Sequence, residues 1–136
     1  MEALKTETHE IRTSQDVVSV RQAVRRFAVE QGFNLVDQTK IVTASSELAR
    51  NTLDYGGGGM AQVETLRNGS RTGLRITFTD EGPGIPDIAL ALKDGFTTGG
   101  GMGLGLGGAK RLSSEFEIES QPGLGTRVSI LRWKGL

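Results

Sequence analysis

Seven of the ten residues from Gly99 to Gly108 are glycines, in the order Gly-Gly-Gly-Met-Gly-Leu-Gly-Leu-Gly-Gly. Glycine loses more backbone freedom on folding than any other residue, so such a cluster destabilises an ordinary folded segment. A ligand that needs bare backbone N–H groups at close range offsets this cost, and polyphosphates are the common ligands of this kind. A second glycine-containing turn, Asp80–Ile85, lies about twenty residues upstream. The cluster therefore favours a nucleotide-binding loop.

Two common phosphate-binding loops do not fit the sequence around this cluster. Gly103-x-Gly105-x-x-Gly108 matches the dinucleotide fingerprint as a string, but that fingerprint follows a hydrophobic strand, and here the segment 96–100 contains two threonines and two glycines. A Walker A loop ends in Gly-Lys-Ser or Gly-Lys-Thr, whereas Lys110 is followed by Arg111. A flexible linker is also disfavoured, because the cluster runs directly into an apolar helical pattern.

The composition is that of one globular domain, to which we assign residues 1–136. Lys+Arg and Asp+Glu number 16 each, so the net charge gives no reason to expect a nucleic-acid or an anionic-membrane partner. No apolar run approaches the roughly 20 residues of a membrane span, and the polar N-terminus does not resemble a signal peptide, so we expect a cytoplasmic protein. The chain has no cysteine, which excludes disulfides, thiol catalysis and Cys-ligated metal.

Apolar periodicity predicts two long helices in the first half of the chain. Thr13 is the expected N-cap of the first helix, whose apolar positions recur up to Ala28 and whose end is marked by Gly32. The second helix is expected from about Leu35 or Asp37 to Tyr55, where the four glycines 56–59 stop it.

Strands are expected on both sides of this helical pair. The predicted strands cover residues 3–12, 61–66, 74–79, 116–120 and 126–133, and residues 67–73 form a hairpin turn. A short helix is expected over 86–93 with Pro86 in its first position, and a further major helix over 104–112. This order predicts an α+β fold, a two-layer sandwich with helices on one face of a mixed, mostly antiparallel sheet.

Four motifs follow one another along the chain: Glu47-x-x-x-Asn51, Asp80-x-Gly82-x-Gly84, Gly103-x-Gly105-x-Gly107 and Gly125-Thr126. Over roughly residues 40–130 they resemble the N, G1 and G2 boxes and the final Gly-Thr of the GHKL ATPase superfamily. Gyrase, Hsp90, histidine kinases and MutL share its Bergerat fold. The small size and the strings 46–51, 80–87 and 108–112 are most similar to the anti-sigma-factor serine/threonine kinases, in particular the RsbT-type switch kinases of bacterial stress signalling.

The resemblance implies a site for ATP and Mg²⁺. Glu47 would be the catalytic residue, accepting the proton of the attacking hydroxyl or orienting it, and Asn51, one helical turn away, would offer its carbonyl oxygen to Mg²⁺. Asp80 would accept a hydrogen bond from the adenine amino group, with Thr126 supporting it through its hydroxyl and a water. Residues 96–101 would form a lid over the nucleotide. The other implied nucleotide-binding residues are Gly82, Gly84 and Ile85 near the base, and Thr98, Gly103, Leu104, Gly105, Leu106, Gly107 and Lys110 near the phosphates.

The implied function is a serine/threonine protein kinase that phosphorylates a STAS-domain antagonist protein in a partner-switching pathway, with a downstream phosphatase or sigma-factor regulator as a further partner. Two alternatives stay open. One is a nucleotide-dependent anti-sigma factor or binding module with incidental catalysis. The other is a histidine-kinase catalytic domain or bare ATPase, although the single histidine, His9, lies in no helical pattern. Arg21, Arg25 and Arg26 could dock an acidic partner or simply solvate the first helix.

Overall fold

Five strands form one sheet in the computed structural model of the chain, which describes residues 1–92 and 106–135. The spatial order is β1-β2-β3-β5-β4, and each of the four pairings is antiparallel. The predicted α+β fold is thus confirmed, and the sheet, expected to be mixed, contains only antiparallel pairs among the described strands. The strands are β1 (Glu2–Ile11), β2 (Gly59–Asn68), β3 (Arg71–Asp80), β4 (Glu115–Gln121) and β5 (Gly125–Trp133).

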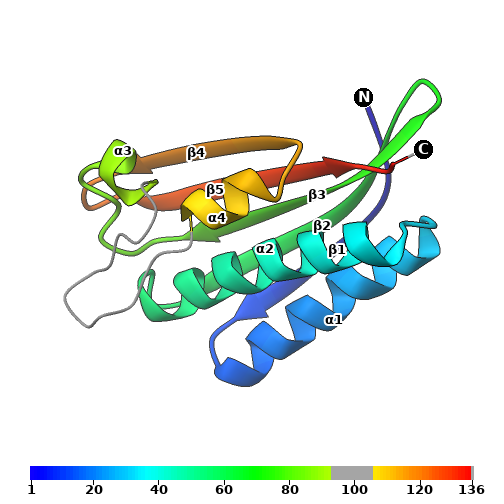
Figure 1. The fold of residues 1–136 in the computed structure, drawn as a ribbon. Coiled ribbons are helices and arrows are strands. Elements are labelled where there is room, and N and C mark those ends of the chain that lie inside the picture. The colour runs from blue at the N-terminus through cyan, green and yellow to red at the C-terminus, as the bar shows by residue number, and fades with distance from the viewer. Residues whose placement is uncertain (93–105, 136) are drawn as a thin grey trace.

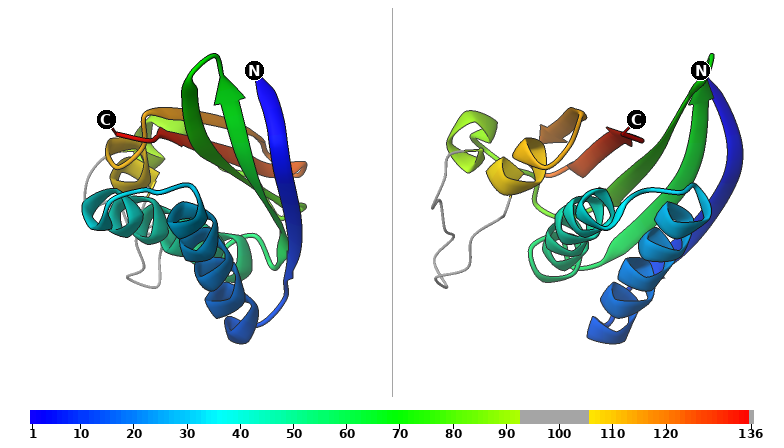
Figure 2. Two further views of the ribbon diagram at one scale, coloured as in Figure 1. Left: turned by 90° about the vertical axis from the view of Figure 1, so that its right-hand side faces the viewer. Right: turned by 45° about the vertical axis from the view of Figure 1, so that its right-hand side comes forward.

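The long helices α1 (Ser14–Glu30) and α2 (Leu35–Asp54) lie against one face of this sheet, which gives the expected two layers (Figure 1). The shorter α4 (Leu106–Arg111) packs beside α2, next to β5, and α3 (Ile88–Ala91) is a single turn near the end of the β4–β5 hairpin. Figure 2 shows that the opposite face of the sheet carries no helix among the described residues. Helices of the length and apolar character needed to cross a bilayer are absent from residues 1–92 and 106–135.

The first helix begins where its sequence predicts. Thr13 is the N-cap of α1, with its hydroxyl accepting from the Asp16 amide at 3.2 Å, and Asp16 Oδ2 accepts in return from the Thr13 amide at 3.0 Å. This reciprocal capping box satisfies two backbone donors that a helix start leaves unpaired. Gly32 then takes φ = +78°, a left-handed conformation that ends the helical run.

The second helix carries part of the candidate site at its C-terminal end. Asn34 caps α2 by accepting from the Asp37 amide at 2.8 Å, and Ile41, Ala44 and Leu48 are buried against the sheet. The four glycines from residue 56 stop the helix as predicted, since two of them, at φ = +75° and +107°, adopt a backbone conformation that other residues rarely reach.

Two local expectations need correction, and a third is tested only from residue 106 onward. The hairpin turn is only Gly69-Ser70, because β2 and β3 stay paired up to Asn68 and Arg71, so most of the turn predicted over 67–73 is strand. Pro86 does not occupy a first helical position, because Asp87 is the N-cap of α3 and its carboxylate accepts from the Leu90 amide at 3.0 Å. The helix expected over 104–112 is described as α4, from Leu106 to Arg111.

A partly buried ion pair joins the two layers. Arg132 on β5 donates to Asp37 Oδ1 in the first turn of α2 at 2.6 Å and to the carbonyl of Leu112, just after α4, at 2.8 Å. The two paired side chains are 17% and 11% exposed, so solvent screens the charges only weakly. One guanidinium therefore fixes α2 and the end of α4 to the same strand.

We predict that Asp37→Asn destabilises the fold by about 2–4 kcal/mol, because it leaves the Arg132 charge without its anion in a poorly solvated place. Chemical denaturation of the purified chain measures this loss. The matched control is Arg67→Gln, which removes an exposed ion pair with Glu2 and is expected to cost less than about 1 kcal/mol. Equal losses in the two variants would contradict this account of Asp37.

Candidate nucleotide-binding site

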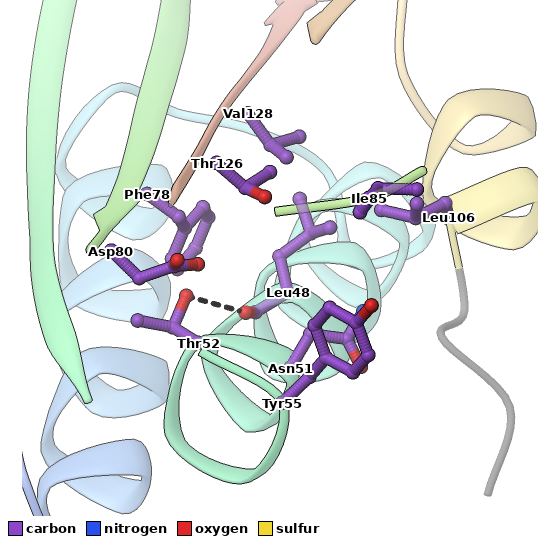
Figure 3. Close-up of a pocket in the computed structure, with 10 residues that line it drawn as sticks. All are labelled: Leu48, Asn51, Thr52, Tyr55, Phe78, Asp80, Ile85, Leu106, Thr126 and Val128. Atoms are coloured by element: carbon purple, nitrogen blue, oxygen red, sulfur yellow. Dashed lines mark hydrogen bonds between the residues drawn. The ribbon is translucent and has the colours of Figure 1, made fainter. Parts of the chain in front are cut away.

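The candidate site is a pocket between α2 and the end of the sheet where β3 stops and β5 starts (Figure 3). Its walls are mostly apolar, and Asp80 and Thr126 point into it from the two strands. The cavity is about 20 Å³. The lining residues are Leu48, Asn51, Thr52, Tyr55, Phe78, Asp80, Ile85, Leu106, Thr126 and Val128.

Asp80 is the acidic group of this pocket. It ends β3 opposite Thr126 on β5, and its Oδ1 accepts from the Gly82 amide at 2.9 Å. Burial raises the pKa of the Asp80 carboxyl, while hydrogen bonds from the Gly82 and Thr126 backbones work in the opposite direction. The fold thus holds a hydrogen-bond acceptor in an apolar pocket at a cost in solvation, which is typical of a binding group.

Glycines leave room for the Asp80 residue on two sides. A Cβ on Gly56 would lie 2.4 Å from the Asp80 Cγ, and a Cβ on Gly125, where φ is +89°, would lie 2.1 Å from the Asp80 carbonyl oxygen. No larger residue fits at either position unless Asp80 moves. Neither glycine was among the predicted site residues.

Gly82 and Gly84 were predicted to let the backbone approach the base. In the structure a Cβ on Gly82 would meet the Gly56 backbone at 2.7 Å, and one on Gly84, at φ = +76°, would meet the Gln121 carbonyl at 2.2 Å. Both glycines are therefore required by packing within the protein itself. Their contact with a base stays a prediction.

A hydroxyl pair links the turn after β3 to the start of β5. Ser120 Oγ accepts from the Ile85 amide at 2.7 Å and lies 2.9 Å from Thr126 Oγ1. The sequence motifs include Ile85 and Thr126 but not Ser120. Ser120 lies near the polar end of a strand, where its sequence context is the same as that of a solvent-exposed serine. The motifs also omit Tyr55 as a site residue; the Tyr55 hydroxyl donates to the Gly84 carbonyl at 3.0 Å.

Asn51 and Glu47 lie on successive turns of α2 but differ in exposure. Asn51 lines the pocket, and its side-chain nitrogen is buried with no hydrogen-bond partner among the described residues. Glu47 is exposed, lies outside the pocket wall, and makes no hydrogen bond or ion pair within the described part of the chain. Between them along the helix, Arg50 forms an ion pair with Asp54, four residues further on, at 3.9 Å.

The structure brings together five of the predicted site residues: Asn51, Asp80, Ile85, Leu106 and Thr126. Gly107 is buried within α4, and Lys110 is exposed on the same helix away from the pocket wall. Thr98, Gly103, Leu104, Gly105 and the expected lid lie outside the described residues. On α1, Arg21, Arg25 and Arg26 are all exposed, and Arg26 pairs with Glu7 at 3.0 Å.

Residues 36–134 match the family model of the histidine kinase-, DNA gyrase B-, and HSP90-like ATPases. The chain belongs to this ATPase family. The GHKL superfamily expected from the four motifs is therefore confirmed.

Two relatives of this ATPase are similar over nearly the whole chain. It is 47% identical over 123 residues to the serine/threonine-protein kinase RsbT of Bacillus subtilis, covering 90% of this chain and 92% of the relative. It is 30% identical over 128 residues to an anti-sigma F factor of a Thermoanaerobacter species, covering 90% and 88%. The expected serine/threonine kinase branch of the family is thereby confirmed.

Solved structures confirm the fold. A Mycobacterium tuberculosis protein with RsbU and RsbW domains superposes with a TM-score of 0.66 at 21% identity, over 98% of this chain and 34% of that one, so this ATPase spans about a third of it. The SiaB–SiaC complex of Pseudomonas aeruginosa gives a TM-score of 0.55 at 19% identity, over 96% and 90%. The catalytic domain of the histidine kinase ThkA gives 0.55 at 17% identity, over 98% and 97%.

We predict that Asp80→Asn weakens ATP binding about 10- to 100-fold, because it removes a charged acceptor and adds an amide donor that faces the base amino group. Isothermal titration calorimetry with Mg-ATP measures the effect. Unchanged affinity would contradict the assignment of Asp80 to the base.

The same variant carries a pH-dependent prediction for stability. Because burial raises the pKa of Asp80 in the folded state, the wild-type fold binds this proton more tightly than the unfolded chain and gains stability as the pH falls through the folded pKa. Asp80→Asn lacks this gain. Denaturation at about pH 7 and about pH 4 is expected to show the wild type gaining stability relative to Asp80→Asn at the lower pH, and a difference of opposite sign would contradict the burial effect.

Proposed function

We propose that this kinase uses Mg-ATP to phosphorylate a serine or threonine of a STAS-domain antagonist protein, in a bacterial partner-switching pathway that regulates a sigma factor. The observation that carries the proposal is the Asp80 carboxylate, held half-buried at the end of an apolar pocket and backed by Thr126. In this proposal the kinase acts in the cytoplasm, where ATP and the sigma factor are found.

The pocket has the chemistry of an adenine site. Phe78, Leu48 and Val128 form apolar walls suited to a planar ring, and Asp80 is the acidic acceptor at one end. A carboxylate only accepts hydrogen bonds, so it pairs with the amino group of adenine and opposes the carbonyl of guanine or hypoxanthine. The donor set of the pocket therefore fits ATP better than GTP.

Asn51 on α2 marks the side of the pocket where we place the phosphates and Mg²⁺. Its side-chain amide reaches the pocket with a buried nitrogen that no described residue satisfies, which is the condition expected of a group that pairs with a ligand. Its carbonyl oxygen is a suitable hard ligand for Mg²⁺, whose role would be to neutralise charge on the phosphates. In this proposal the phosphates of ATP and water supply the remaining ligands of the ion.

Glu47 is well placed for a protein substrate because it is exposed. A hydroxyl on another protein reaches only a surface base, and no ion pair within the described residues competes for this carboxylate. In the proposed step Glu47 takes the hydroxyl proton while the substrate oxygen bonds to the γ-phosphorus. The bond from that phosphorus to the bridging oxygen breaks, and ADP leaves.

The relatives support a protein partner. RsbT is by name a serine/threonine-protein kinase, and SiaB, which shares the fold, was solved in complex with SiaC. In this proposal phosphorylation lowers the affinity of the antagonist and releases the kinase to a downstream phosphatase or sigma-factor regulator. Arg21 and Arg25 are exposed on α1, and in this proposal their basic face of the helix contacts the partner protein.

An anti-sigma factor is the second candidate function, and the 30% identity to an anti-sigma F factor favours it. In that case nucleotide binding would tune the affinity for a sigma factor, and phosphate transfer would be incidental. The two functions share the pocket and differ in whether Glu47 is needed.

We predict that Glu47→Ala lowers phosphate transfer to the partner about 10²- to 10⁴-fold while the Kd for Mg-ATP stays within about twofold, because the carboxylate acts on the hydroxyl and not on the nucleotide. Transfer from labelled ATP and calorimetry are the two measurements. The matched control is Glu30→Ala, which removes an exposed glutamate that pairs with Lys5 and should leave both unchanged.

Retained transfer in Glu47→Ala would contradict its role in the chemical step. If transfer is lost but ATP still controls release of the partner at the wild-type concentration, the anti-sigma or binding-module function is favoured instead. The Glu47→Ala variant therefore distinguishes the kinase function from the anti-sigma function.

We also predict that Asn51→Ala removes most of the Mg²⁺ dependence of ATP affinity, because no other described residue of the pocket offers a neutral amide ligand. Wild-type affinity should fall when EDTA replaces Mg²⁺, whereas the variant should bind weakly in both conditions. A response to Mg²⁺ in the variant as large as that of the wild type would contradict this assignment.

A further inference from the structure

Arg50 lies on α2 between the two residues proposed for catalysis and Mg²⁺ binding, but its guanidinium contacts neither of them. Its Nη1 donates to the Ser14 hydroxyl at 3.3 Å and lies 3.9 Å from Asp54 Oδ1. Ser14 is the first residue of α1, which packs beside α2 (Figure 1). Arg50 therefore links the start of one long helix to the end of the other.

The spacing along α2 makes Glu47 the favoured partner of Arg50. Glu47 is three residues before Arg50 and Asp54 is four residues after it, so both carboxylates are helical neighbours of the guanidinium. An acid that precedes its basic partner gives the more stable pair, because this order agrees with the helix dipole. Glu47 nevertheless makes no ion pair within the described part of the chain, and Arg50 pairs in the less favoured direction.

The observed contacts also oppose the dipoles of both helices. Ser14 is in the first turn of α1, and a helix is positive at this end, so a cation is disfavoured there. Asp54 is the last residue of α2, where the helix is negative and an acid is disfavoured. The ion pair with Arg50 offsets the second cost but not the first. Contacts that oppose local preferences in this way are typical of functional positions.

We propose that Ser14 and Asp54 are positioning residues for phosphate transfer, which hold the Arg50 guanidinium away from Glu47. The inference rests on the proposed role of Glu47 as the base. A guanidinium beside that carboxylate would stabilise its negative charge and occupy an oxygen atom, which makes it a weaker acceptor for the hydroxyl proton. Because Arg50 is bound elsewhere, the exposed carboxylate stays free for the substrate.

The first test measures phosphate transfer from labelled Mg-ATP to a purified STAS-domain protein from the same organism, with both at saturating concentration. The combined variant Ser14→Ala/Asp54→Asn removes both contacts of Arg50. An exposed pair at the three-residue spacing is favoured over its open state by about twofold, so about one third of the Glu47 carboxylates stay free and kcat falls about threefold. The Kd for Mg-ATP should stay within about twofold of the wild-type value, because the nucleotide contacts are unchanged.

Arg50→Gln provides the rescue in this test. On its own it is expected to leave kcat within about 1.5-fold of wild type, and adding it to Ser14→Ala/Asp54→Asn should restore that value. A loss of helix packing would instead grow with the third substitution. The matched control is Glu2→Gln, which frees Arg67 from an exposed pair at 3.4 Å between β1 and β2 and should leave kcat unchanged.

The second test does not depend on activity. The nuclear magnetic resonance signal of the Arg50 Nε–Hε group responds to Glu47→Gln only if the two side chains are paired. In the otherwise wild-type chain, Glu47→Gln is expected to leave this signal unmoved. In the Ser14→Ala/Asp54→Asn chain it is expected to shift the signal. A shift in the otherwise wild-type chain would show that Glu47 and Arg50 are already paired, and would overturn the inference.

Three further results would overturn it. They are a wild-type kcat in a Ser14→Ala/Asp54→Asn chain whose Arg50 signal reports the new pair, no new pair in that chain, and a loss of kcat in Arg50→Gln alone. The last result would assign Arg50 to the substrate or the phosphates. Transfer retained in Glu47→Ala would instead remove the proposed base, and this inference with it. Denaturation checks folding, and if the combined variant does not fold, Asp54→Asn alone replaces it with the same expected direction.

Discussion

Asp80 and Thr126 are cross-strand partners at the point where β3 ends and β5 begins, and this pairing determines the geometry of the site. It places an acceptor and a hydroxyl side by side over the C-terminal half of α2, in a pocket that otherwise offers apolar walls. Burial raises the pKa of Asp80, so the fold gives up some stability to hold this group. Such a loss is typical of residues retained for binding.

The surrounding structure is arranged to keep Asp80 in that position. Gly56 and Gly125 leave no room for a side chain beside it, and Ser120 joins the turn after β3 to Thr126. Arg132 fixes α2 and the end of α4 to β5 through Asp37 and the Leu112 carbonyl. The helix that carries Glu47 and Asn51 is thereby held against the strand that carries Thr126.

Much of the fold could be predicted because its signals are local. The capping box at Thr13 and the glycines after Tyr55 mark helix ends through backbone chemistry that the sequence displays directly. Site residues could be predicted only where they belong to a recognisable sequence motif, as Asn51 and Asp80 do. Ser120 and Gly56 were not predictable in this way. Ser120 accepts a hydrogen bond from the Ile85 amide, 35 residues away in the sequence. A Cβ on Gly56 would clash with Asp80. No spacing pattern in the sequence encodes either contact.

We propose above all that the pocket at Asp80 is the nucleotide site of this kinase. Nuclear magnetic resonance of the labelled chain during a Mg-ATP titration tests it most directly, since it locates the ligand without any mutation. Saturable shifts are expected at the Gly82 and Thr126 amides, which neighbour the Asp80 carboxylate. Shifts confined to the helix-free face of the sheet, with these two amides unmoved, would contradict it.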